Sequence, residues 1–326
     1  MSSPAPVIEL IDAFRRSKAM FAALSLGVFD RLHNGPTDVG SFGGNRDAME
    51  RLLDACAGLG LLEKGGGLYR NTPLAEKYLC RSSPDTLYGY IAYSNNVLYP
   101  MWGHLEDAVR EGSNRWHQTF GVEGPLFSHF FKSPESTRDF LMGMHGFGRI
   151  SSPAIVSAFD LSRFRKMVDL GGATGHLALA AVERYPHLEA AVFDLPPVIT
   201  VAREFAGGRI GLLEGDFFED PLPAADLFAL GRILHDWNDE KIARLVRKIY
   251  DRLPSNGALL VCERLLAEGK DGPVPTQMQS LNMLVATEGK ERTLGEYTTL
   301  LQAAGFGSVE GRVTGVTLDA ILAVKP

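Results

Sequence analysis

The fold class follows from residues 166–180, KMVDLGGATGHLALA. The apolar run from Met167 to Leu170 is typical of a buried strand, and it passes directly into the glycine-rich turn Gly171–Gly175. A helical pattern begins after this turn and continues to Tyr185. A strand, a glycine turn and a helix in this order predict the first unit of a doubly wound α/β sheet.

Downstream of this unit, short apolar runs continue to alternate with helical patterns. A helix is expected from Asp239 to Leu253, and Thr293 with Glu296 forms the signature of a capping box that opens another. Further strands are expected at 190–195, 212–214, 225–230, 258–262, 308–313 and 318–324. We therefore predict a Rossmann-like, mostly parallel sheet.

The N-terminal part has a different pattern. Helices are expected from Val7 to Leu24 and from Arg46 to Leu59, and two short strand-like runs flank Gly65–Gly67. Helices followed by a small hairpin indicate a winged-helix-like domain. With 326 residues the chain is long enough for two domains, which we place at 1–95 and 96–326, the second opening with a helical linker. Residues 34–45 are glycine-rich, and we expect poor order there.

Composition excludes several classes of protein. The formal net charge of -6 provides no basic footprint for nucleic acid. Neither a secretory signal nor a run of about 18 apolar residues is found, so we expect no membrane span. The three cysteines, Cys56, Cys80 and Cys262, are not spaced as a metal clip or redox pair, which favours a cytoplasmic protein.

Three short segments, each at the end of a predicted strand, carry residues that are suited to binding a nucleoside. The turn at Gly171 lets a ligand approach the backbone, and Asp194 is placed to accept hydrogen bonds from ribose hydroxyls. Gly215, Asp216 and Phe217 follow the third strand, where a carboxylate and a ring could hold adenine. Dinucleotides and methyl donors both fit this pattern. NADP is disfavoured because Arg203 is the one basic residue near Asp194, whereas NAD stays open.

His235 follows the fourth strand, at the sheet edge where ligands of doubly wound folds bind. An imidazole has an ordinary pKa of about 6.5 and is suited to take a proton from a phenol, whose pKa is about 10. The spacing of the other histidines predicts no catalytic metal. We expect His176, just inside the glycine turn, to be an exposed helix residue.

The segment Ile233–Trp237, ILHDW, resembles the catalytic segment of plant-type small-molecule O-methyltransferases, and most of all that of the acetylserotonin O-methyltransferase-like enzymes. The likeness covers nearly the whole chain. Its other matching stretches are 102–105 (WGHL), 158–162 (AFDLS), 215–218 (GDFF), 280–285 (SLNMLV), 287–293 (TEGKERT) and 319–323 (DAILA).

The resemblance implies a class I methyltransferase domain that uses S-adenosylmethionine, and an N-terminal domain that forms a homodimer. It implies that His235 is the general base and that Glu263 and Glu291 flank it. The cofactor residues that it implies are Gly171, Asp194, Asp216, Phe217 and Arg232. The substrate residues that it implies are Asn282, Phe131, Met144 and His145. The expected reaction is methylation of a hydroxyl group on a small phenol-like or hydroxyindole-like molecule.

Two residues depart from the pattern of the acetylserotonin-type enzymes. Ala286 stands where they carry a glutamine that holds the substrate side chain, and Gly148 stands where they carry a tryptophan near the cofactor. Both departures leave the substrate open. Methylation of nitrogen or carbon, an NAD-dependent oxidoreductase and a DNA-binding regulator are the alternative functions, the last disfavoured by the acidic charge balance.

Overall fold

The computed structural model describes residues 3–124, 131 and 133–326. The chain divides into two compact units, Met1–Val97 and Leu98–Pro326. The division falls two residues after the boundary expected from the sequence. Among the described helices, none is both long enough and apolar enough to cross a bilayer.

The first unit joins helices to a three-stranded sheet of order β1-β3-β2. Gly66 and Gly67 have φ angles of 60° and 80°, as the tight turn between β2 and β3 requires. The segment 34–45 contains β1 and a 3-10 helix at Val39–Phe42, so the expectation of poor order is wrong. The elements are α1 (Ala5–Ser25), α2 (Val28–His33), β1 (Thr37–Asp38), α3 (Arg46–Gly58), β2 (Leu62–Gly65), β3 (Leu68–Asn71), α4 (Pro73–Tyr78) and α5 (Tyr88–Tyr93).

The helix α1 carries an uncovered apolar stripe. Leu10 is 77% exposed, although the opposite end of the helix buries Phe21 and Leu24 in the core of the unit. Contiguous exposed apolar patches of this kind commonly mark interaction surfaces. The stripe consists of Val7, Ile8, Leu10, Ile11 and Phe14.

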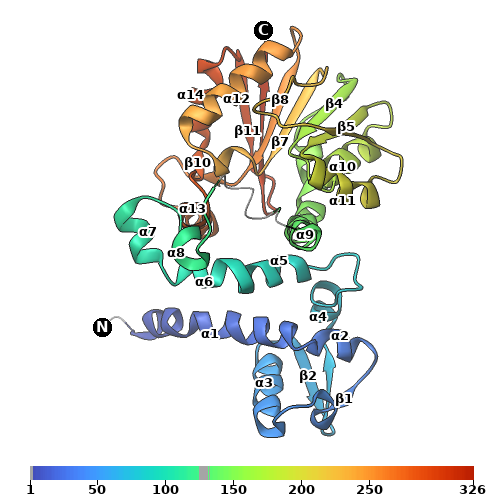
Figure 1. The fold of residues 1–326 in the computed structure, drawn as a ribbon, viewed down its shortest axis with the longest axis vertical. Coiled ribbons are helices and arrows are strands. Elements are labelled where there is room, and N and C mark those ends of the chain that lie inside the picture. Colours follow the sequence, from blue (N-terminus) through green and yellow to red (C-terminus); the bar gives the residue numbers. More distant parts are fainter. Residues whose placement is uncertain (1–2, 125–130, 132) are drawn as a thin grey trace. The chain divides into compact units, whose positions relative to one another are not determined.

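The second unit is built on a seven-stranded sheet of order β11-β12-β8-β7-β4-β5-β6 (Figure 1). Strands β4 to β8 run parallel, and β12 and β11 are added antiparallel at one edge. The predicted doubly wound, mostly parallel sheet is thus confirmed. The strands are β4 (Lys166–Leu170), β5 (Glu189–Asp194), β6 (Gly211–Glu214), β7 (Leu227–Gly231), β8 (Ala258–Glu263), β9 (Leu265–Leu266), β10 (Arg292–Thr293), β11 (Ser308–Arg312) and β12 (Asp319–Val324).

Helices cover both faces of this sheet (Figure 1). Side chains alternate along each strand, so that Val168 packs under α12 and α14, whereas Met167 packs under α9, α10 and α11. The helices of the unit are α6 (Tyr99–Trp102), α7 (Leu105–Glu111), α8 (Trp116–Phe120), α9 (Pro134–Ala158), α10 (His176–Arg184), α11 (Pro196–Ala206), α12 (Asp239–Arg252), α13 (Val274–Ala286) and α14 (Leu294–Ala303). A π-helical turn, Ser94–Leu98, precedes α6.

The strand order places a topological switch point between β4 and β7. The chain leaves β4 toward β5 and β6 on one side, then returns to β7 on the other side. Ligands of open α/β sheets bind at such a switch point, outside the carboxyl ends of the strands. The turns after these two strands begin at Gly171 and Arg232, so the fold brings the glycine turn and the His235 segment to the same edge.

Candidate active site

A single carboxylate holds the turn that carries His235. Glu263, at the end of β8, is completely buried, and its Oε1 accepts the backbone N–H groups of Ile233, Leu234 and His235 at 3.0, 2.8 and 3.4 Å. Arg232 opens the turn with a left-handed φ of 59°. Because non-glycine residues rarely adopt this conformation, the three hydrogen bonds to Glu263 account for its retention.

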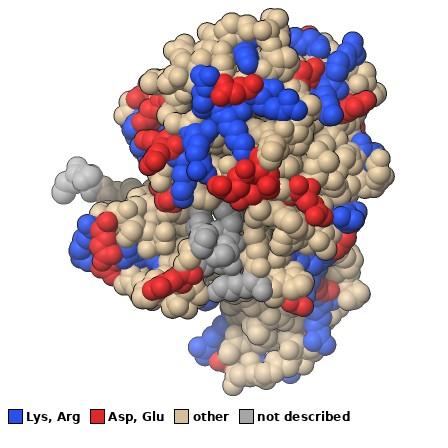
Figure 2. All heavy atoms as spheres, turned by 45° about the horizontal axis from the view of Figure 1, so that its top comes forward, with Lys and Arg blue, Asp and Glu red and all other residues tan. Residues whose placement is uncertain are grey.

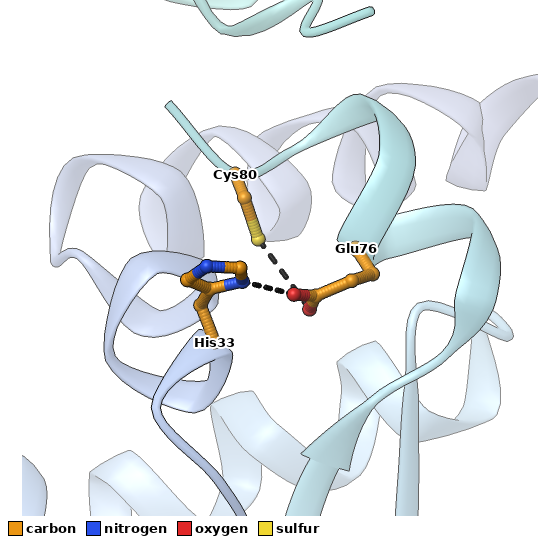
Figure 3. Close-up of side chains that lie close together, drawn as sticks. All are labelled: His33, Glu76 and Cys80. Carbon is orange, nitrogen blue, oxygen red and sulfur yellow. Dashed lines mark hydrogen bonds and ion pairs between the residues drawn. The ribbon is translucent and has the colours of Figure 1, made fainter. Parts of the chain in front are cut away.

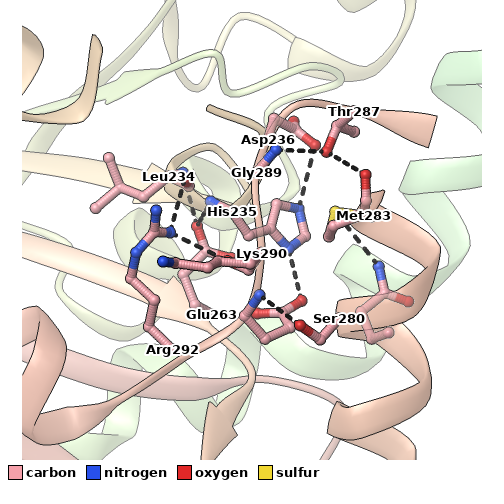
Figure 4. Close-up of polar contacts among 12 residues, drawn as sticks. Leu234, His235, Asp236, Glu263, Ser280, Met283, Thr287, Gly289, Lys290 and Arg292 are labelled. Carbon is pink, nitrogen blue, oxygen red and sulfur yellow. Dashed lines mark hydrogen bonds and ion pairs between the residues drawn. The ribbon is translucent and has the colours of Figure 1, made fainter. Parts of the chain in front are cut away.

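The imidazole of His235 lies among carboxylates (Figure 4). Its Nδ1 is 2.8 Å from Oε1 of Glu291 in a hydrogen bond, and 3.3 Å from Oε2 of Glu263 as an ion pair. Since Nδ1 carries the hydrogen that Glu291 accepts, Nε2 is the ring atom left to exchange a proton. On that side Asp236 Oδ1 lies 3.7 Å away. The structure therefore brings together the three residues predicted to be catalytic.

Burial and charge set the proton affinity of this cluster. Burial by itself lowers the pKa of His235, but the surrounding carboxylates, above all that of Glu263, outweigh it and raise the pKa to about 9. Burial raises the pKa of Glu263 to about 7 against the opposing effect of the imidazole. The cluster therefore keeps a proton on or beside the imidazole at neutral pH.

Glu291 is positioned by α13 and by a close backbone contact. Its N–H donates to Ser280 Oγ at 3.3 Å, and a Cβ on Gly289 would lie 2.1 Å from the His235 carbonyl oxygen. The buried guanidinium of Arg292 donates to Asp239 at 2.6 Å, and thereby ties this segment to the start of α12. Ser280 and Arg292 were not among the predicted site residues, although both lie in stretches that carried the resemblance.

The glycine turn after β4 is packed too tightly for side chains. A Cβ on Gly171 would lie 2.5 Å from Ile233 Cδ1, and one on Gly172 would lie 2.6 Å from Asp169 Oδ2. Asp194 braces the turn, since its Oδ2 accepts the N–H of Ala173 at 3.0 Å. Its Oδ1 accepts the N–H of Leu195. The carboxylate predicted to bind the ribose therefore also stabilises the turn.

Two buried acids lie beneath this turn. Burial, together with the neighbouring Asp194, raises the pKa of Asp169 to about 8, and burial raises the pKa of Asp194 to about 6. Among the described residues, Oδ2 of Asp169 is buried without a hydrogen-bond partner. No cationic side chain of the described residues lowers either pKa, and a cationic ligand would favour the charged forms. Asp169 was not among the residues predicted to bind a ligand.

The residues predicted to bind adenine lie next to the glycine turn. Phe217 Cε1 lies 3.3 Å from the position of a Cβ on Gly171, and Gly215 is packed against the ring of Phe193. Asp216 Oδ1 accepts the N–H of Phe218 at 2.7 Å, which shapes the turn after β6. The fold thus gathers the predicted cofactor residues along one edge of the sheet.

The helix α9 closes over the glycine turn through two imidazoles. His145 Nδ1 lies 2.8 Å from Thr174 Oγ1, and His176 Nδ1 lies 2.9 Å from Ser152 Oγ. Burial lowers the pKa of His145 to about 4 and that of His176 to about 3, so both rings are neutral at physiological pH. The expectation that His176 is an exposed helix residue is wrong. Its position directly after Gly175 was the available signal.

Gly148 has a packing reason in this structure. A Cβ on Gly148 would lie 2.2 Å from the ring of His176, so this imidazole occupies the space where any larger residue on α9 would project. The small residue at position 148 and the histidine at position 176 therefore depend on each other, because the His176 ring fills the space beside Gly148.

Three of the four predicted substrate residues have defined contacts. Asn282 on α13 accepts a hydrogen bond from Trp102 Nε1 at 2.9 Å. Phe131 packs edge-on against Phe140 at 6.1 Å between ring centroids. His145, as described, contacts the glycine turn. Met144 is half-buried on α9.

Two clusters in the described part of the chain have donor atoms close enough to bind a metal ion. One is His235, Glu263 and Glu291, so the prediction of a metal-free site stays a prediction. The other is His33, Glu76 and Cys80, where His33 and Cys80 both contact the Glu76 carboxylate (Figure 3). There the amide of Asn71 donates to both Glu76 and Cys80, which engages lone pairs that a metal ion would need.

Charged side chains of both signs are interspersed on the face of the molecule in Figure 2. Exposed pairs such as Arg244–Glu219 and Arg138–Glu204, at 3.0 and 2.6 Å, illustrate this pattern on the second unit. On the displayed face the positive charges are therefore partly compensated by neighbouring acids.

Comparison with known proteins gives consistent matches. Residues 102–307 match the model of an O-methyltransferase domain, and residues 8–81 match that of an O-methyltransferase dimerisation domain. The acetylserotonin O-methyltransferase of Gallus gallus is 43% identical over 99% of this chain and 97% of its own length, and that of Bos taurus is 42% identical over 97% and 96%. A crystal structure of human N-acetylserotonin methyltransferase in complex with SAM superposes with a TM-score of 0.95 at 41% identity, covering 100% of this chain and 98% of that one.

Proposed function

The chain belongs to the O-methyltransferase family, and from this premise we propose that it transfers a methyl group from S-adenosylmethionine to the hydroxyl group of a hydroxyindole-like acceptor, with His235 as the base. The observation that carries the proposal is the His235–Glu291 hydrogen bond, which leaves Nε2 for the acceptor proton.

The residues at the carboxyl ends of β4, β5 and β6 fit S-adenosylmethionine. This donor carries positive charge on its sulfonium and its ammonium group, and the buried acids Asp169 and Asp194 lie at the glycine turn. We assign Asp194 to the ribose hydroxyls, Asp216 and Phe217 to the adenine, and Gly171 and Arg232 to the remaining contacts. A human relative of 41% identity was crystallised with this donor.

The chemistry requires alignment and one proton transfer. When bound, S-adenosylmethionine supplies an electrophilic methyl group. The protein holds the acceptor hydroxyl in line with it, which lowers the entropic part of the barrier. His235 Nε2 takes the hydroxyl proton, while Glu291 and Glu263 stabilise the imidazolium that forms.

The raised pKa of His235 suits a phenolic acceptor. A phenol has an ordinary pKa of about 10, close to the value of about 9 for this imidazole. Proton transfer between groups of similar pKa is nearly balanced, and a well-placed base contributes roughly 100- to 10,000-fold to the rate. A base of ordinary pKa would be about three units weaker than the phenolate it must generate.

The acceptor class that we propose follows from the relatives. The matched enzymes of Gallus gallus and Bos taurus are acetylserotonin O-methyltransferases, which act on a hydroxyindole. In this chain we place Asn282, Phe131, Met144 and His145 around the acceptor. Ala286 leaves the acceptor arm without the glutamine of the acetylserotonin-type enzymes, so we propose a hydroxyindole with a different arm.

We also propose that the protein acts as a homodimer in the cytoplasm. The dimerisation-domain match at residues 8–81 and the uncovered apolar stripe on α1 support the dimer. The unpaired, buried thiols of Cys56, Cys80 and Cys262 suit a reducing compartment.

The proposal is tested by incubating the protein with S-adenosylmethionine and a panel of hydroxyindoles, simple phenols, and matched indoles that lack the hydroxyl. Mass spectrometry then locates the added methyl group. We expect methylation of oxygen in the hydroxyindoles and none in the matched indoles. Methylation of the latter on nitrogen or carbon would contradict the proposal, and parallel calorimetry with S-adenosylhomocysteine and NAD excludes or reveals a nicotinamide enzyme.

A further inference from the structure

His176 is the first residue of α10, at the point where the glycine turn passes into the helix. Its imidazole is half-buried, and Nδ1 lies 2.9 Å from the hydroxyl oxygen of Ser152 on α9. The ring also packs directly against Gly148, where a Cβ would lie 2.2 Å from it. These two contacts with α9 hold the ring in place and engage only one of its two nitrogens.

The hydroxyl of Ser152 decides which ring nitrogen carries the hydrogen. Ser152 is 1% exposed, and among the described residues its hydroxyl has no partner other than His176. A buried hydroxyl hydrogen without an acceptor is costly, so it is donated to Nδ1. The imidazole is neutral because burial lowers its pKa to about 3, and its single N–H group is therefore at Nε2.

The Nε2–H group of His176 has no acceptor in the part of the chain that the structure describes. Nε2 is also not one of the fully enclosed atoms that lack a partner there, so this edge of the ring is open to a ligand. The ring therefore offers one hydrogen-bond donor at the start of α10, directly after the glycine turn.

A second group of donors, the guanidinium of Arg232, belongs to the same region. Its neighbour Gly231 is packed against α10, because a Cβ there would lie 3.9 Å from Leu177 Cδ2. Burial and His145 are the larger causes of the low pKa of His176, and the charge of Arg232 adds to them, as expected of a nearby cation. Arg232 is half-buried and forms neither a hydrogen bond nor an ion pair with any residue that the structure describes.

The polar groups around the glycine turn thus divide by charge. The buried acids Asp169 and Asp194 lie beneath it, whereas His176 and Arg232 provide only N–H donors. The amino-acid end of S-adenosylmethionine is a zwitterion with an ammonium group and a carboxylate. Because a carboxylate only accepts hydrogen bonds, it suits both donors, and such charge-assisted bonds are among the stronger ones in proteins.

We propose that the Nε2–H group of His176, together with the guanidinium of Arg232, binds the carboxylate of the methionine part of S-adenosylmethionine. This inference rests on the proposed function, which requires this donor. It gives His176 a role in ligand binding in addition to its packing against α9. A neutral imidazole suits this role, because it donates a hydrogen bond without adding a positive charge near the sulfonium.

The test compares two ligands that differ in one group, S-adenosylhomocysteine and its decarboxylated analogue, which retains the ammonium group. Their dissociation constants are measured by calorimetry with the wild type and with His176→Phe, His176→Ala and His187→Phe. His176→Phe keeps a ring beside Gly148 but has no N–H group, whereas His176→Ala removes the ring altogether. His187→Phe is the matched control, because this exposed imidazole lies beyond the other end of α10 and contacts the Ser162 carbonyl.

In the wild type we expect the decarboxylated analogue to bind about tenfold to 100-fold more weakly than S-adenosylhomocysteine, the size of hydrogen bonds to a charged group. Both variants of His176 weaken the binding of S-adenosylhomocysteine about tenfold. They change the affinity for the analogue by less than about twofold, because the lost N–H group has no carboxylate to bind there. His187→Phe retains both wild-type affinities, and melting curves of the free proteins verify that each variant is folded.

Equal weakening of both ligands in the two variants of His176 would overturn the inference, because it is the signature of a role in packing alone. Equal binding of the two ligands by the wild type would overturn it as well. Failure of the wild type to bind S-adenosylhomocysteine would overturn the inference and the proposed function together. The expected binding pattern in a protein that methylates no hydroxyindole would support the inference and contradict the proposed function.

Discussion

Glu263 binds His235 at two places, because Oε1 accepts the backbone N–H at 3.4 Å while Oε2 lies 3.3 Å from Nδ1 of the ring. The same Oε1 also accepts two further N–H groups of the turn. One carboxylate therefore both shapes the segment after β7 and raises the proton affinity of the imidazole that the segment carries. The carboxylate of Glu291, in contrast, binds His235 through the ring.

Replacement of His235 by alanine should abolish proton transfer without disturbing the donor site. We expect kcat to fall by roughly 100- to 10,000-fold, the usual contribution of a positioned base. The affinity for S-adenosylhomocysteine, measured by calorimetry, should stay within about threefold of the wild type, since the proposed donor contacts lie on other residues. An unchanged kcat would remove His235 as the base.

The pH dependence of kcat/KM should reveal the proton on His235. The folded pKa is raised to about 9, so the imidazole is mainly protonated below that pH and cannot act as a base. We expect kcat/KM to rise about tenfold per pH unit toward pH 9 and then to level off.

The variant Glu291→Gln tests whether the rising limb of this pH profile arises from His235 or from ionisation of the acceptor. Loss of one carboxylate that raises the pKa of His235 should move the limb to lower pH, and should also lower the plateau because the imidazolium loses stabilisation. A limb that stays at the same pH in the variant would show that the phenol, not His235, titrates.

The packing of Gly148 against His176 predicts a rescue. Gly148→Ala places a Cβ 2.2 Å from the His176 ring, and we expect it to cost about 1–3 kcal/mol of stability, as for overpacked cores, and to weaken S-adenosylhomocysteine binding. His176→Ala in the same chain should recover most of the melting temperature. Gly58→Ala, where nothing lies within 4 Å of the added Cβ, is the matched control. Equal effects at 148 and 58 would contradict the contact.

The apolar stripe of α1 predicts the interface of the dimer. Ile11→Asp combined with Phe14→Asp places two charges on side chains that are 57% and 54% exposed in the single chain. Burying unpaired charges in an interface is costly, so the variant should elute as a monomer in light-scattering chromatography at micromolar concentration. Arg16→Asp, outside the stripe, should remain dimeric. A wild-type monomer under these conditions would contradict the proposal itself.

The cluster of His235, Glu263 and Glu291 also permits a direct test of the metal-free mechanism. After dialysis against a chelator, the protein should retain its activity, and elemental analysis should find less than about 0.1 metal ion per chain, since a tightly held structural or catalytic ion would be close to stoichiometric. Loss of activity that a divalent cation restores would assign these residues to a metal centre.

Local patterns in the sequence were sufficient to predict the fold and to place the candidate site residues at strand ends. The alternation of apolar strands with helical patterns after Lys166 determined a doubly wound sheet, because strand and helix periods are local properties. The turn at Gly171, the acid Asp194 and the predicted base His235 were placed at strand ends by the same pattern, and parallel strands bring their ends to one edge.

Only the tertiary structure decided which side chains distant in sequence form hydrogen bonds or pack against each other. The triple acceptance by Glu263, the contact of Gly148 with His176 and the hydrogen bond from Trp102 to Asn282 each join residues 28 or more positions apart. Such pairings depend on strand order and helix docking rather than on local propensity. Composition and periodicity therefore left them undetermined, and only the packed structure shows which side chains hold the His235 turn and which pack α9 against the glycine turn.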